Sequence, residues 1–151
     1  MSKPTLEDAI ILATTLHRGQ VDKAGARYIL HPLRVMCDPS LTTENERITA
    51  VLHDVVEDCD ITFDELRERE YDEEVVEALG FLTKLPGEDY GPFIRRVCSG
   101  SVIARKVKWA DLRDNSNLSR IPDPTPWDLK RNEKYVQAMT RIEESFTALW
   151  E

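Results

Sequence analysis

The chain contains three histidines, and two of them lie in sequence settings that suit a metal site. His53 is followed directly by Asp54, and the same short run ends with Glu57 and Asp58. Adjacent histidine and aspartate side chains offer an imidazole nitrogen and a carboxylate oxygen, which divalent ions such as Mn, Fe or Zn accept as ligands. The run therefore suggests part of a transition-metal site whose other ligands must come from elsewhere in the chain.

Two further side chains are candidates for those ligands. His31 is a second nitrogen donor, and Asp111 is a carboxylate in an otherwise largely apolar helical segment. A buried carboxylate costs free energy unless it is paired or holds a metal ion. From spacing alone, two interpretations stay equally open, a metal site made of His31, His53, Asp54 and Asp111 and a set of solvated polar side chains.

The apolar spacing around this run predicts a single continuous helix. Apolar residues recur at i, i+3, i+4, i+7 and i+8, at Ile48, Val51, Leu52, Val55 and Val56. On a helical wheel, the polar side chains fall on the side opposite this stripe, at His53, Asp54, Glu57 and Asp58. A spacing of four places His53 beside Glu57 and Asp54 beside Asp58. We therefore expect these four groups on the open face of one helix.

Helical spacing of apolar residues continues along nearly the whole chain, and no segment shows convincing strand alternation. Thr5 is the expected N-cap of the first helix, and Thr62 and Glu65 have the spacing of a capping box. The proline-rich segment 121–126 cannot be helical in its interior. We expect an all-α, single-domain protein over residues 1–151, with about seven or eight helices, at 6–16, from His31 to 36, 48–56, 62–69, 75–82, 93–100, 102–118 and 127–150.

The composition fits a soluble globular protein and excludes several classes of partner. The 151 residues include 20 Lys and Arg against 28 Asp and Glu, a net charge of -8. This balance argues against general binding to nucleic acids or anionic membranes, and no apolar run is long enough to span a membrane. The acidic N-terminal segment does not resemble a signal peptide. Together with three widely spaced cysteines that lack a CxxC pattern, it indicates a cytoplasmic protein.

Several motifs follow one another along the chain in a characteristic order. Segment 19–25 leads into Tyr28-Ile29-Leu30-His31-Pro32, and the run from His53 to Asp58 has the form HDxxED. Segments 82–84 and 90–97 come next, and residues 108–115 have the form K-x-A-D-x-x-x-N. This ordered set, from about residue 6 to 135, resembles the HD metal-dependent phosphohydrolase superfamily. It is most similar to the hydrolase domain of RelA/SpoT homologues and the stand-alone small alarmone hydrolases.

The resemblance implies an HD-type helical bundle and a specific reaction. Proteins of this branch remove pyrophosphate from the 3′ position of guanosine tetra- and pentaphosphate, and they use Mn2+. The metal ligands implied for this chain are His31, His53, Asp54 and Asp111, with Mn2+ or another divalent transition metal as cofactor. A metal ion in such a site lowers the pKa of its bound water and neutralises charge on the phosphate.

The resemblance also implies roles for side chains beyond the metal ligands. Glu57 and Asp58 would position and activate the attacking water, because a carboxylate that does not bind the metal can accept its proton. The partner is then a small-molecule nucleotide polyphosphate. The implied substrate contacts are Lys23, Asn115, Arg131 and Tyr135.

One residue departs from the family pattern. At Asp22 the better-known members carry a basic residue that helps cover the guanine base, and an aspartate cannot stack as a guanidinium does. Two alternatives to hydrolysis of guanosine 3′,5′-bis(diphosphate) therefore stay open. The chain is a related phosphohydrolase for another nucleotide or phosphate ester, or it is a non-catalytic nucleotide sensor. The presence of all four ligands together with Glu57 and Asp58 counts against the sensor.

Overall fold

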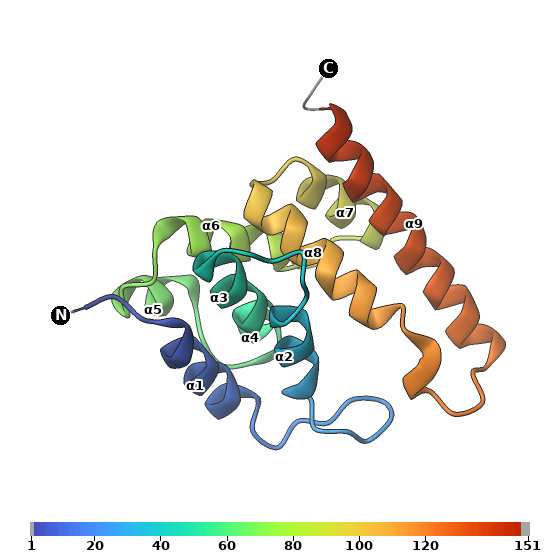
Figure 1. Cartoon of the computed structure of the whole chain (residues 1–151), viewed down its shortest axis with the longest axis horizontal. Helices are drawn as coiled ribbons and strands as arrows, with labels where there is room; N and C mark the ends of the chain where they lie inside the picture. Colours follow the sequence, from blue (N-terminus) through green and yellow to red (C-terminus); the bar gives the residue numbers. More distant parts are fainter. Residues whose placement is uncertain (1, 149–151) are drawn as a thin grey trace.

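The computed structural model describes residues 2–148, and within this range its regular secondary structure is helical apart from one isolated β-bridge (Figure 1). The helices are α1 Leu6–His17, α2 Leu30–Met36, α3 Glu44–Leu52, α4 Val55–Asp58, α5 Phe63–Glu68, α6 Glu73–Leu82, α7 Tyr90–Cys98, α8 Val102–Asn115, the 3-10 helix η1 Leu118–Arg120, and α9 Pro126–Ala148. The predicted all-α class is confirmed. Because α4 is a single turn of four residues, the eight longer α-helices of this range agree with the number expected.

Helix α3 forms the centre of the fold. It packs against α1, α2, α6 and α8, and its residues Val51 and Leu52 are fully buried. Helix α8 continues the core toward α7 and α9, where Leu112 and Ile142 are buried in the same cluster. Figure 1 shows the long helix α9 lying along α8 at the edge of the molecule. No helix of the described range combines the length and apolarity needed to cross a membrane.

Side-chain caps fix where several helices begin. The side chain of the predicted N-cap Thr5 accepts a hydrogen bond from the Asp8 amide, and the Asp8 carboxylate accepts one from the Thr5 amide. Thr43 forms the same reciprocal box at the start of α3, and Thr62 accepts from the Glu65 amide at the start of α5. Each such cap satisfies an amide that has no partner within its helix.

The prediction of one continuous helix through His53 and Asp54 is wrong. Helix α3 ends at Leu52 and α4 begins at Val55, so the two polar residues form the break between them. His53 is only 3% exposed, whereas the helical wheel placed it on the open face. The physical reason is that the ring turns inward, where its Nδ1 lies 2.7 Å from the Ala50 carbonyl oxygen. The break thus directs a polar pair into the interior.

The loop between α1 and α2 is held by its own hydrogen bonds. The Asp22 carboxylate accepts from the amides of Ala24 and Ala26, at 2.9 Å each. The backbone adds a bond from the Asp22 amide to the Ala26 carbonyl, and an isolated β-bridge joins Val21 to Arg27. Gly25 has φ +85°, a conformation that favours glycine. Asp22 therefore organises this loop.

Candidate metal centre

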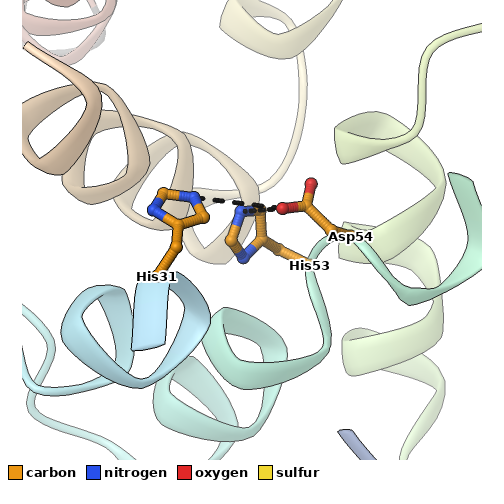
Figure 2. A group of neighbouring side chains, drawn as sticks. All are labelled: His31, His53 and Asp54. Atoms are coloured by element: carbon orange, nitrogen blue, oxygen red, sulfur yellow. Dashed lines mark ion pairs between the residues drawn. The ribbon is translucent and has the colours of Figure 1, made fainter. Parts of the chain in front are cut away.

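The four side chains proposed as ligands lie together although they come from separate parts of the chain. His31 comes from the first turn of α2, His53 and Asp54 from the α3–α4 break, and Asp111 from α8. His31 Nε2 lies 2.8 Å from Asp111 Oδ1 and 3.9 Å from Asp54 Oδ2. His53 Nε2 lies 3.0 Å from Asp54 Oδ2 and 3.2 Å from Asp111 Oδ1. Figure 2 shows the two rings and the Asp54 carboxylate directed toward one another.

The outer ring nitrogens of both histidines are held by oxygen acceptors. His31 Nδ1 lies 2.7 Å from Asp114 Oδ2, and His53 Nδ1 lies 2.7 Å from the Ala50 carbonyl oxygen. A carbonyl oxygen accepts but cannot donate, so the Nδ1 of His53 carries the proton. The neutral form of each ring then presents the Nε2 lone pair to the centre, which is the tautomer that a metal ion needs.

One atom in particular is placed as a metal ligand would be. His53 Nε2 is buried and makes no hydrogen bond of acceptable geometry, although two carboxylate oxygens lie close to it. A buried nitrogen between two carboxylates, without a hydrogen bond to either, is the arrangement expected of ligands around an ion. The donor set of two imidazole nitrogens and carboxylate oxygens also matches the ligands of Mn, Fe and Zn.

The ionisable groups at the centre shift each other's pKa values. Burial by itself lowers the pKa of His53, but the carboxylates of Asp54 and Asp111 outweigh it and raise this pKa well above its usual value. Burial likewise disfavours ionised Asp54, yet His53 lowers the Asp54 pKa to about 2. The imidazoles and the carboxylates of this centre therefore favour each other's charged forms. A divalent cation bound here would favour ionised carboxylates and neutral imidazoles, so its binding would release protons.

A second layer of side chains fixes the ligands, and sequence reasoning missed most of it. Asp114, which holds His31, is itself bound by Arg34 at 2.8 Å and lies 3.3 Å from Arg120. The half-buried Lys108 ammonium lies 2.9 Å from Asp111 Oδ2. Asp114 follows Asp111 by three residues, so both lie on one helix face, and this spacing was the available signal.

Tyr28 and Asn115 also contact the proposed ligands. The Tyr28 hydroxyl donates a hydrogen bond to the Asp54 carboxylate. The side-chain amide of Asn115 donates to Asp111 Oδ1 at 3.1 Å. Asn115 is therefore placed beside the centre, where it supports a ligand in addition to facing the cavity described below.

Glu57 and Asp58 lie next to the centre on α4. Carboxylate oxygens of Asp54, Glu57 and Asp58 fall within 4.8 Å of one another. One Glu57 oxygen accepts a hydrogen bond from the Lys84 backbone amide at 3.0 Å, which fixes this side chain. Burial and the charges of Asp54 and Glu57 raise the pKa of Asp58 to about 6. Asp58 therefore offers a carboxylate that can exchange a proton near neutral pH.

A cavity of about 390 Å³ opens at this centre. Its walls include His31, Asp54 and Asp111, and the predicted substrate contacts Asn115 and Tyr135. The cations of the wall are Arg34, Lys84, Lys108, Arg120 and Lys134, and the carboxylates are Asp22, Asp54, Glu57, Asp58, Asp111 and Asp114. A volume of this size suits a small-molecule ligand.

Two predicted substrate contacts, Lys23 and Arg131, are not among the residues that line this cavity. Arg131 Nη2 instead pairs with Asp128 Oδ1 at 3.0 Å, at the start of α9. The Thr125 amide and, more weakly, the charges of Arg131 and Lys23 lower the pKa of Asp128. Lys23 and Arg131 therefore share the neighbourhood of one carboxylate outside the cavity wall.

Comparison with known proteins identifies relatives but no matching family model. A guanosine-3′,5′-bis(diphosphate) 3′-pyrophosphohydrolase of Vibrio cholerae is 34% identical over 125 residues, 80% of this chain and 17% of that protein. A protein of the same description from Aquifex aeolicus is 37% identical over 82 residues, 53% of this chain and 12% of the relative. A GTP pyrophosphokinase of Myxococcus xanthus is 33% identical over 82 residues, 53% of this chain and 11% of that protein. The chain thus spans less than a fifth of these relatives.

A solved structure shares the fold over most of its length. It is that of a metazoan ortholog of SpoT described as hydrolysing ppGpp. The TM-score is 0.75 at 24% sequence identity, and the match covers 96% of this chain and 88% of the other. The two proteins therefore share one helical fold.

Proposed function

The chain belongs to the RelA/SpoT family, through its homology to a segment of the guanosine-3′,5′-bis(diphosphate) 3′-pyrophosphohydrolases, and from this we propose that it is a metal-dependent hydrolase of guanosine 3′,5′-polyphosphates. The reaction would leave GDP or GTP and release pyrophosphate. The observation that carries the proposal is the convergence of two imidazole Nε2 atoms and two carboxylates, three of which, on His31, Asp54 and Asp111, belong to side chains that line one cavity.

We propose that His31, His53, Asp54 and Asp111 hold the metal ion, and that this ion is Mn2+. The tautomer of His53, the buried unbonded Nε2 and the mixed nitrogen and oxygen donors support this assignment. When bound, such an ion supplies Lewis acidity, which lowers the pKa of a bound water and offsets phosphate charge. The Lys108 ammonium and the Asn115 side-chain amide would hold the Asp111 carboxylate in place for this task.

Glu57 and Asp58 are proposed to position the attacking water and to accept its proton. Both carboxylates line the cavity, and both lie close to Asp54 without being among the four proposed ligands. The bond from the Lys84 amide leaves Glu57 with one oxygen free to orient a water molecule. Asp58 has no such restraint in the described residues, so it is the better candidate for the proton acceptor.

The nucleotide would occupy the cavity, with Asn115 and Tyr135 in its wall and Lys23 and Arg131 outside it. The loop geometry reduces the objection raised by Asp22. Its carboxylate is bound by two amides of its own loop, so it has a structural use that does not depend on the base. We propose a small-molecule partner in the cytoplasm, rather than a nucleic acid or a membrane.

The direct test is release of pyrophosphate from guanosine 3′,5′-bis(diphosphate) by the purified protein with added Mn2+. Asp58→Asn should keep its metal content and lose about 100- to 10,000-fold in turnover, the range of general acid–base contributions. Asp60→Asn is the matched control, because Asp60 is an exposed carboxylate two residues away that does not line the cavity.

Each alternative gives a different result in this assay. Full metal occupancy without turnover of this nucleotide would refute the proposed substrate. Phosphate release from another nucleotide or a phosphate ester in a wider screen would then identify a related hydrolase. A sensor would bind the nucleotide without turnover, and its binding would survive in the Asp58→Asn variant.

A further inference from the structure

Lys134 is a cation of the cavity wall that has no acidic partner in the described residues. Its ammonium lies 4.2 Å from the centre of the Tyr90 ring and 5.9 Å from that of Tyr135. By contrast, Arg34 and Arg120 pair with Asp114, and Lys108 pairs with Asp111. Lys134 therefore lies in the cavity with its positive charge available to a ligand.

Tyr90 adds an unused hydrogen-bond donor at the same place. Its hydroxyl oxygen is buried and has no hydrogen-bond partner in the structure, although buried polar atoms are normally paired. Burial raises the pKa of Tyr90 to about 12, so the hydroxyl keeps its proton at neutral pH. Tyr90 and Lys134 line the same cavity, and their contact defines one corner of it.

This corner of the cavity adjoins the metal centre through α7 and α8. Tyr90 and Phe93 are three residues apart, on one face of the first turn of α7. The Lys108 ammonium lies 5.0 Å from the centre of the Phe93 ring and binds Asp111 on its other side. Phe93 thus links Tyr90 to Lys108, and Lys108 contacts the proposed metal ligand Asp111.

The charge balance of the cavity indicates what such a corner binds. Six carboxylates and five cations line the wall, and three of those cations are committed to carboxylates. A nucleotide with several phosphates needs positive charge beyond a single divalent ion. An uncommitted ammonium beside an unpaired hydroxyl provides both charge and a directed hydrogen bond for a phosphate oxygen.

Resting on the proposed function, we propose that Lys134 and Tyr90 form an anion subsite for a phosphate group of the nucleotide other than the one attacked at the metal. The Lys134 ammonium and the Tyr90 hydroxyl would each donate a hydrogen bond to this phosphate. The ring of Tyr90 would hold the lysine side chain above it, which lowers the cost of ordering that side chain. The subsite would make the protein bind polyphosphorylated nucleotides more tightly than nucleoside monophosphates.

The test uses inorganic pyrophosphate, the proposed product, as the probe. The Mn2+-loaded protein is titrated by calorimetry in a buffer that contains Mn2+, and metal content is measured before and after. Lys134→Met should weaken pyrophosphate binding by about 10- to 100-fold, as expected for a hydrogen bond to a charged group. Tyr90→Phe should weaken it less, because the ring stays, and Lys134→Arg should restore most of the affinity.

Lys130→Met is the matched control, since Lys130 is exposed on the same helix and does not line the cavity. The subsite is refuted if wild-type protein does not bind pyrophosphate, or if Lys134→Met binds it as tightly as wild type. In the turnover assay, Lys134→Met should raise KM more than it lowers kcat. If pyrophosphate binding depends on Lys134 but the wild-type protein shows no turnover, only the proposed function is refuted. If the protein shows turnover and Lys134→Met leaves KM unchanged, only the subsite is refuted.

Discussion

His31 shows how a single side chain at this centre is fixed from two sides. Its Nε2 faces Asp111, and its Nδ1 lies 2.7 Å from Asp114, which two arginines hold in turn. Hydrogen bonds from His31 and Arg34 lower the pKa of Asp114 to about 2 despite its burial, so this carboxylate is ionised at neutral pH. An ionised acceptor on Nδ1 makes the opposite nitrogen a stronger ligand.

Asp114→Ala should therefore weaken metal binding without removing a ligand. Loss of such a support typically costs about 10- to 100-fold in metal affinity, because the ring loses its tautomer and its orientation. Titration of metal-free protein with Mn2+, read as free Mn2+ by electron paramagnetic resonance, measures this change. Asp64→Ala, at a side chain that is 86% exposed, is the control. Equal affinities in the two variants would show that Asp114 does not support the site.

At the residue scale, the sequence predicted which side chains meet but not what holds them. His31, His53, Asp54 and Asp111 were identified through ordered motifs, and the structure brings them together. Charged residues on a helix are usually solvated, so the three-residue spacing between Asp111 and Asp114 does not by itself distinguish a supporting carboxylate from a solvated one. Tertiary contacts alone make that distinction, and they also place Lys23 and Arg131 outside the cavity.

At the scale of elements, the α3–α4 break explains why hydrophobic periodicity misled the prediction. Val51 and Leu52 before the break and Val55 after it are all buried, as one continuous stripe requires. The spacing of apolar residues survives because the chain resumes helical geometry after only two residues. The inward turn of His53 depends on partners from α2 and α8, which no local pattern contains.

One arginine, Arg96, holds the loop between α6 and α7. The contribution of its ion pair with Glu88 to the stability of the protein should depend on pH. Arg96 binds both Glu88 oxygens at 2.9 Å and reaches the carbonyl oxygens of Gly80 and Thr83. Hydrogen bonds from Arg96 lower the pKa of Glu88 to about 2. A carboxylate with a lowered pKa in the folded state stabilises the protein above its unfolded pKa and loses that effect as pH falls.

Glu88→Gln should consequently destabilise the protein at neutral pH but not in strong acid. The difference in unfolding free energy between wild type and Glu88→Gln should have its full value above about pH 4.5. It should vanish as the pH falls toward about 2. Urea unfolding at a series of pH values measures it. Glu133→Gln, at an exposed position, should show no such trend. A difference that stays constant with pH would exclude ionisation of Glu88 as the cause.

At the scale of the whole molecule, shared helices join the core clusters into one body. Helix α3 contributes Val51 to one cluster and Ala50 to the next, and α8 contributes Val107 to the second and Leu112 to the third. This continuity supports the single domain that we propose for residues 1–151. The third cluster fixes α9, which carries both Lys134 and Tyr135.

Ile142→Ala tests how firmly α9 is attached. Ile142 belongs to α9 and is fully buried in the cluster that this helix shares with α7 and α8. Its truncation should therefore cost about 2–5 kcal/mol of unfolding free energy. Ile11→Ala makes the same chemical change at a side chain that is 65% exposed, and it should change stability by less than about 0.5 kcal/mol. Urea denaturation compares the two variants. Similar small losses in both would mean that α9 contributes little to the cooperative fold.

Metal removal should lower the stability of the entire chain. The proposed ligands His31 and Asp111 are 80 residues apart, so the unfolded chain offers no preformed site. An ion at 100 times its dissociation constant then adds about 2.7 kcal/mol to the folded state, which corresponds to roughly 5–10 °C in melting temperature. Thermal melts with Mn2+ and with excess chelator measure this shift, and Asp111→Asn should abolish it.

The same separation of ligands along the chain has a consequence for turnover in the cell. Proteases act mainly on opened conformations, so the lifetime of a marginally stable protein follows its folded fraction. A chain whose two halves are tied by one ion would be degraded faster when that ion is scarce. Its abundance, as well as its catalytic state, would then report on metal supply.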